Sequence, residues 1–141
     1  MTKQLIKSIF LTLILSCSSA SLFAQDILSK SLTKNLSVSG LMTTEKFSQL
    51  MTDGFKSVIV NRPDNESGNL VTVNELRDIA EKKHVGVIYQ PVESGKITQK
   101  DITEFAQYYN ELPKPILMIC KSGTRSALLY NQAKTQGLLH E

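Results

Sequence analysis

One short segment of the sequence combines residue types that can carry nucleophilic chemistry. Residues 120–126 read Cys-Lys-Ser-Gly-Thr-Arg-Ser and directly follow the apolar run at residues 116–119. The apolar run predicts a buried strand that ends at Cys120, and a helix is predicted from about Arg125 or Ser126. At such a strand-to-helix turn, backbone N–H groups and the helix start can bind an anion. The planar guanidinium of Arg125 can add two further donors.

The same features favour a thiolate over a neutral thiol, so Cys120 is the predicted nucleophile. Gly123 suits the turn because glycine adopts positive φ values without a steric penalty. The predicted anion-binding loop consists of Lys121, Ser122, Gly123, Thr124 and Arg125. The alternative is a buried structural cysteine followed by an ordinary turn, with Arg125 in a surface ion pair.

The composition of the chain narrows the range of functions. The chain has 141 residues, of which 41% are apolar and 21% are charged, as expected for one ordinary globular domain. It contains 2 cysteines and 2 histidines, which excludes a disulfide scaffold and a multi-cysteine zinc module. We therefore expect no metal and no other cofactor.

The first 24 residues have the pattern of a secretory signal peptide. Lys3 and Lys7 precede a short apolar run at residues 9–15, and small residues at 16–20 lead to Ser-Leu-Phe-Ala at 21–24. We expect cleavage after Ala24 and an exported protein, either periplasmic or secreted. A lipobox at Cys17 is the alternative, and only its lipidation would bring the protein to a membrane. A permanent anchor would need a longer apolar run.

The sequence that remains after this cleavage restricts the partners. It holds 14 basic and 13 acidic residues, and Cys120 is its single cysteine. This balance argues against a nucleic-acid partner, which would require a clear basic excess. A single free thiol is unusual in an oxidising compartment, and a role as a nucleophile would explain it. We expect a small anionic substrate, either a phosphate ester or a sulfane sulfur donor.

The rest of the chain predicts the elements that position this loop. We interpret residues 25–35 as a lead-in and residues 36–141 as one domain. Strands are predicted at residues 36–39, as a short edge strand, at 57–61 and 85–89, and at 116–119 as the central strand. Helices are predicted from Thr43 to about residue 53, from Thr72 to about 83, from Thr98 to about 112, and over about 125–136.

This alternation predicts an α/β fold with a mostly parallel sheet of four to five strands, flanked by helices. Ligands of such sheets bind beyond the carboxyl ends of the strands. The loops at that edge are residues 62–69, 91–97 and 120–125, and all three hold polar or charged side chains.

Three segments together resemble a known family. They are Ser-Val-Ile-Val-Asn-Arg-Pro-Asp-Asn-Glu at 57–66, Gln-Pro-Val-Glu-Ser-Gly-Lys-Ile-Thr at 90–98, and the loop at 120–126. Over residues 36–134 the chain is similar to the phosphatase-like domain of beta-lactamase-hydrolase-like proteins. The resemblance implies the fold of the dual-specificity cysteine phosphatases. Proteins of this family are assigned both phosphatase-like and sulfur-transferase activities, so the resemblance leaves the reaction open.

The length of the loop points to a second family. Four residues separate Cys120 from Arg125, which resembles the active-site loop of rhodanese-type sulfurtransferases. The phosphatase loop is usually one residue longer and has a histidine before the cysteine, where this chain has Ile119. In sulfur transfer, the cysteine carries a persulfide and no proton donor is needed.

Hydrolysis of a phosphate ester needs more catalytic groups than sulfur transfer does. Cys120 would attack phosphorus while the loop amides and Arg125 hold the oxygens, and the resemblance implies that Ser126 assists departure of the thiolate. An acid must protonate the leaving oxygen. Glu93 is the first candidate and Asp64 the second, with Glu66 ranked lower.

Each of these carboxylates could instead be a solvated loop residue. Arg62 either adds a second anion contact or fixes its turn through a carboxylate pair. We favour an exported cysteine-dependent phosphatase-like hydrolase. A rhodanese-type sulfurtransferase is the alternative, and a non-catalytic module that binds anions or a partner is the third interpretation.

Overall fold

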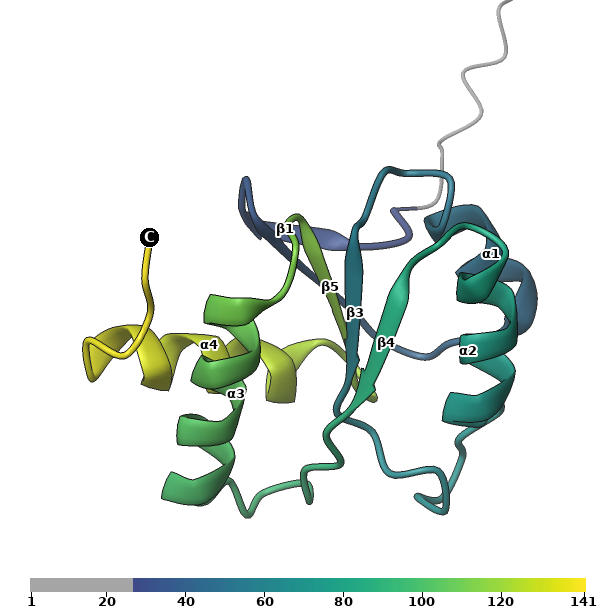
Figure 1. Cartoon of the computed structure of the whole chain (residues 1–141). Helices are drawn as coiled ribbons and strands as arrows, with labels where there is room; N and C mark the ends of the chain where they lie inside the picture. The colour runs from purple at the N-terminus through teal and green to yellow at the C-terminus, as the bar shows by residue number, and fades with distance from the viewer. Residues whose placement is uncertain (1–26) are drawn as a thin grey trace, which may run out of the picture.

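A computed structural model describes residues 27–141, which form five strands and four helices (Figure 1). The predicted signal peptide at residues 1–24 and the predicted lipobox cysteine, Cys17, lie outside the described residues. Across residues 27–141, the helices are too short or too polar to cross a membrane.

The strands form one mixed sheet with the order β1-β2-β5-β3-β4. Strand β1 is antiparallel to β2, and every other neighbouring pair is parallel. The strands are β1 (Lys30–Thr33), β2 (Leu36–Ser39), β3 (Ser57–Val60), β4 (Gly86–Tyr89) and β5 (Ile116–Ile119). This confirms the predicted α/β fold with a mostly parallel sheet, and it confirms β5 as the central strand.

The predicted edge position of residues 36–39 is wrong. Strand β2 is an inner strand, because β1 pairs with it on the side away from β5. The residues of β1 were assigned to the lead-in, and their sequence Lys-Ser-Leu-Thr carries no strong apolar pattern. Strand β1 forms the edge and buries little, so composition gives only a weak signal for it.

The helices are α1 (Thr44–Leu50), α2 (Val73–Glu81), α3 (Gln99–Glu111) and α4 (Thr124–Thr135). Thr43, Thr72 and Thr98 are N-cap residues, as predicted, and each hydroxyl accepts a hydrogen bond from the amide three residues later. These bonds satisfy amides that have no partner within their helix. The helix starts agree with the sequence analysis, whereas α1 and α2 end one turn or less before the predicted residues.

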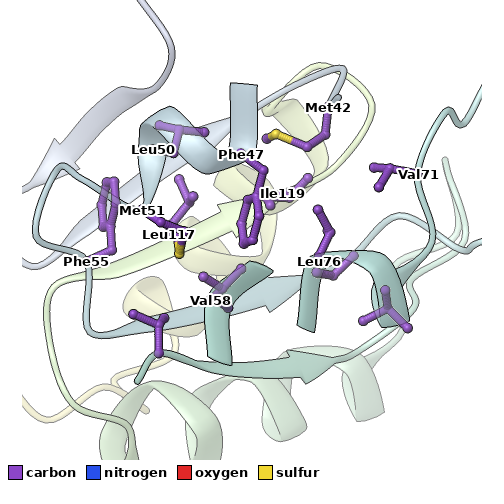
Figure 2. Close-up of a cluster of buried hydrophobic side chains, with 14 residues drawn as sticks. Met42, Phe47, Leu50, Met51, Phe55, Val58, Val71, Leu76, Leu117 and Ile119 are labelled. Atoms are coloured by element: carbon purple, nitrogen blue, oxygen red, sulfur yellow. The ribbon is translucent and has the colours of Figure 1, made fainter. Parts of the chain in front are cut away.

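Helices α1 and α2 cover one face of the sheet, and α3 and α4 cover the other (Figure 1). Successive residues of β5 point to opposite faces. Leu117 and Ile119 belong to the cluster below α1 and α2 (Figure 2), while Ile116 and Met118 belong to the cluster below α3 and α4. The central strand is therefore buried on both faces, which explains its continuous apolar sequence. The parallel strands β3, β4 and β5 bring their following loops to the same edge.

Candidate active site

Cys120 directly follows the central strand and has 1% of its surface exposed. Its Sγ accepts a hydrogen bond from the Gly123 amide at 3.0 Å. Gly123 is the N-cap of α4 and has a φ of 87°, which confirms the predicted need for glycine at this turn. An amide donor and the positive end of a helix dipole both stabilise negative charge on sulfur. The local fold therefore suits a thiolate nucleophile.

Arg125 lies in the first turn of α4 with 7% of its surface exposed. Its Nη1 donates to the Val92 carbonyl at 3.0 Å, and its Nη2 donates to Glu66 Oε1 at 2.7 Å. Its Nε is buried and has no hydrogen-bond partner among residues 27–141. The two terminal nitrogens of the guanidinium therefore fix its orientation.

Glu66 contacts two arginines at once. Its second oxygen, Oε2, lies 2.8 Å from Nε of Arg62. The two atoms form an ion pair but no hydrogen bond, because the Nε–H bond of Arg62 does not point at the oxygen. Arg62 is buried and also donates from Nη2 to the Ser67 carbonyl at 2.9 Å. Of the two predicted roles of Arg62, the structure shows the carboxylate pair that fixes the turn. Arg62 is not among the residues that line the cleft beside Cys120.

Ser126 belongs to a buried hydrogen-bond chain behind the loop. Its hydroxyl donates to Asn61 Oδ1 at 2.8 Å, and Asn61 Nδ2 donates to the Gln90 carbonyl at 3.1 Å. Asn61 is fully buried after β3, and Gln90 follows β4. The chain joins the start of α4 to the ends of both strands. In this arrangement the Ser126 proton is directed to Asn61 and not to Cys120.

The two carboxylates ranked first as general acids occupy different environments. Asp64 Oδ1 accepts a hydrogen bond from the Val73 amide at 2.9 Å, so Asp64 stabilises the start of α2. Glu93 is 72% exposed and lies 3.7 Å from Nζ of Lys96. Neither carboxylate lines the cleft beside Cys120, but Ser94, the next residue after Glu93, does.

The cleft has a volume of about 740 Å³ and lies between the loop at residues 94–97, the Cys120 loop and helix α4. Of the predicted anion-binding loop, Lys121, Ser122, Thr124 and Arg125 line it together with Cys120. Its other lining residues are Ser94, Gly95, Ile97, Gln99, Ile102, Leu128, Gln132 and Gln136. Within residues 27–141, no three His, Cys, Asp or Glu side chains are close enough to hold a metal ion.

Several residues of this region carry little signal in the sequence. Gly40 follows β2 and packs against the Cys120 loop, where an added Cβ would lie 3.0 Å from Ser122 Cα and 3.1 Å from the Lys121 carbonyl. A glycine after a strand that neighbours the central strand is the signal that could have identified it. For Leu128 and Gln132 the sequence predicts only a helix, because nothing in it shows which face of α4 borders the cleft.

Known proteins share this fold. The crystal structure of a candidate phosphatase from Neisseria meningitidis z2491 is 29% identical and has a TM-score of 0.69, covering 74% of this chain and 75% of that chain. The core catalytic domain of the PP-IP phosphatase SIW14 from S. cerevisiae has a TM-score of 0.54 at 15% identity, covering 76% of this chain and 74% of that chain. The fold is therefore that of the cysteine phosphatases.

Sequence relatives agree with the structural ones. The Beta-lactamase hydrolase-like protein of Agrobacterium fabrum is 32% identical over 97 residues, which cover 69% of this chain and 22% of the relative. The chain thus spans about a fifth of the length of the curated relatives that it matches. The family model of the beta-lactamase hydrolase-like protein, phosphatase-like domain, matches residues 29–137, and the chain belongs to this family.

Proposed function

We propose that this protein is a cysteine-dependent phosphatase-like hydrolase that acts on phosphate esters. The observation that carries the proposal is the 3.0 Å hydrogen bond from the Gly123 amide to Cys120 Sγ at the start of α4. Arg125 borders the same cleft, and its buried Nε has no hydrogen-bond partner in the described part of the chain. The phosphatase-like family and the fold of the structural relatives support this choice.

In the proposed reaction, Cys120 Sγ attacks phosphorus in line with the ester oxygen. The S–P bond forms as the P–O bond to the leaving group breaks, and the leaving oxygen takes a proton. Loop amides and Arg125 stabilise the charge on the remaining phosphoryl oxygens. Water then attacks the thiophosphate, which releases phosphate and restores the thiolate.

Arg125 is suited to this role because its position is fixed before substrate binds. Glu66 and the Val92 carbonyl each accept one hydrogen bond from its terminal nitrogens. A donor that is already oriented loses little entropy when it binds the transition state. Glu66 and Val92 are therefore positioning groups for Arg125 in the proposed mechanism.

Glu93 is the proposed general acid, because it directly precedes the cleft-lining residue Ser94 and its carboxylate is exposed. Asp64 is less suited, since its carboxylate is bound to the start of α2. A movement of the loop at residues 91–97 would bring Glu93 towards the leaving oxygen, as general acids often align only when substrate is bound.

One observation favours sulfur transfer as a second candidate function. Among the described residues that line the cleft, none carries a carboxylate. With thiosulfate, the Cys120 thiolate would take the outer sulfur, the S–S bond would break, and sulfite would leave with the electron pair. That reaction produces no alkoxide and needs no acid.

The mass of the protein distinguishes the two reactions. The wild-type protein and Cys120→Ser are mixed separately with 4-nitrophenyl phosphate and with thiosulfate, quenched and weighed by electrospray. We expect release of nitrophenolate and a phosphoryl adduct on wild-type protein, with neither in Cys120→Ser. A stable gain of one sulfur without release of nitrophenolate would replace the hydrolase with the sulfurtransferase. If neither compound modifies Cys120, both reactions are ruled out, and the protein is a non-catalytic module that binds anions or a partner.

We also propose that the protein is exported, on the basis of the basic, apolar and small-residue pattern of residues 1–24. N-terminal sequencing of the protein from its native host tests this. The expected first residue is Gln25. A lipidated Cys17 or an intact Met1 would contradict cleavage after Ala24.

A further inference from the structure

The charged side chains of the cleft are confined to one end. Of the described lining residues, Lys121 and Arg125 carry charge, and both belong to the Cys120 loop or the start of α4. Apart from Cys120, the rest of the lining consists of serine, threonine, glycine, glutamine, isoleucine and leucine residues. A second anionic group on a ligand would therefore have no cation opposite it along the remaining length.

Helix α4 forms a neutral wall of the cleft. Leu128, Gln132 and Gln136 follow one another at intervals of four residues, so they lie on one face of the helix. From Thr124 to Gln136 this wall is about 18 Å long at the α-helical rise per residue. Leu128 is 46% exposed, which gives the wall an apolar patch one turn from Arg125.

A pair of exposed amides meets where the cleft borders the end of α4. Gln99 Nε2 donates to Gln136 Oε1 at 2.7 Å, and Gln136 Nε2 donates to Gln99 Oε1 at 3.1 Å. This pair joins the start of α3 to the end of α4, two helices that pack side by side (Figure 1). The lining therefore ends about 18 Å from the start of α4, a length that suits a small molecule.

We infer that the cleft selects a small ligand with a single anionic head group and an uncharged, partly apolar organic body. The head group lies at the Cys120 loop beside Lys121 and Arg125, and the body lies along Leu128 and Gln132. This inference rests on the proposed function for the place of the head group. It adds the class of substrate, a phosphate monoester of an uncharged aryl or alkyl group, and excludes molecules with several phosphates.

Protection of Cys120 from iodoacetamide measures binding without requiring turnover. Three probes are compared at constant ionic strength. Inorganic phosphate represents the head group alone, 2-naphthyl phosphate adds a neutral apolar body, and inositol hexakisphosphate is a polyanion. Alkylation of Cys120 is followed by mass spectrometry, and hydrolysis of 2-naphthyl phosphate is followed in parallel.

We expect 2-naphthyl phosphate to protect at a concentration at least about tenfold below that of inorganic phosphate, because its body buries apolar surface. Inositol hexakisphosphate should protect no better than phosphate. Stronger protection by the polyanion, equal protection by phosphate and the naphthyl ester, or no protection by any probe would overturn the inference. Protection in the expected order without hydrolysis would leave the class of ligand standing and refute the hydrolase.

Variants of α4 test the neutral wall itself. Leu128→Asn should remove most of the preference for 2-naphthyl phosphate and leave protection by inorganic phosphate unchanged. The matched control is Leu70→Asn, an exposed leucine outside the cleft. Gln132→Lys should improve protection by inositol hexakisphosphate, whereas Asn131→Lys, an exposed neighbour outside the lining, should not. An unchanged probe order in both Leu128→Asn and Gln132→Lys would place the ligand body elsewhere.

Discussion

Glu66 Oε1 lies 2.7 Å from Arg125 Nη2, although the two residues are 59 positions apart in the chain. The other oxygen of this carboxylate faces Arg62. A buried guanidinium without an opposite charge is costly. Glu66 therefore compensates two buried arginines and fixes the orientation of the one that borders the cleft.

Glu66→Gln should destabilise the protein by about 3 kcal/mol, because two buried guanidiniums would then lack a negative charge. Urea unfolding measures this change. The control is Glu93→Gln, whose carboxylate is exposed and pairs with Lys96 at 3.7 Å, and a change below about 0.5 kcal/mol is expected there. Equal stabilities of the two variants would show that Glu66 has no structural role.

Arg125→Lys should lower turnover of 4-nitrophenyl phosphate by about 10²-fold, the usual effect of losing one oriented oxyanion donor. Lysine cannot donate to Glu66 and Val92 and also present an Nε–H to substrate. The control is Arg77→Lys on the exposed side of α2, which should keep activity within about twofold. Similar activity in both variants would mean that Arg125 serves only the fold.

Gly40→Ala should displace the Cys120 loop, since the new methyl group would lie 3.0 Å from Ser122 Cα. Backbone atoms of the loop cannot move aside as a flexible side chain can, so turnover should fall by at least about tenfold. The control is Gly86→Ala in β4, where an added Cβ has no atom within 4 Å. A fully active Gly40→Ala would show that the loop tolerates this shift.

The order of elements and the nucleophilic loop could be predicted from the sequence because their signals are local. Each signal is contained in a stretch of a few residues. The signals are the apolar run of β5, the capping threonines and the segment from Cys120 to Arg125. Strand β1 could not be predicted, because it is polar and depends on pairing with β2.

The partners of the site residues could not be predicted either, because they come from distant segments. Arg125 contacts Glu66 and Val92, and Ser126 contacts Asn61 across 65 positions. The sequence predicts the loop that holds Glu66, but as a general acid Glu66 ranks below Glu93 and Asp64. Only the packing of three loops at one sheet edge shows that it binds two arginines.

Asn61→Ala should destabilise the protein by about 2 kcal/mol, because it leaves the Ser126 hydroxyl and the Gln90 carbonyl without their buried partner. A double-mutant cycle with Ser126→Ala, followed by urea unfolding, measures the coupling between the two side chains. We expect a coupling of about 1 kcal/mol. Strictly additive effects would show that the 2.8 Å contact between Ser126 Oγ and Asn61 Oδ1 contributes nothing to stability.

The identity of the general acid decides between the two reaction classes. Glu93→Gln should lower turnover of an alkyl phosphate by about 10²-fold and of 4-nitrophenyl phosphate far less, because nitrophenolate leaves without a proton. Asp64→Asn should instead cost about 1 kcal/mol of stability through a weaker contact with the start of α2, with no dependence on the leaving group.

A leaving-group dependence in Asp64→Asn would keep the mechanism and transfer the acid role from Glu93 to Asp64. If neither variant shows it, while Cys120→Ser is inactive and thiosulfate still adds sulfur to Cys120, hydrolysis of phosphate esters is ruled out. The reason is chemical: transfer of sulfur to a thiolate releases sulfite and leaves no alkoxide to protonate. The cleft, whose described lining residues include no carboxylate, would then match the reaction without an acid.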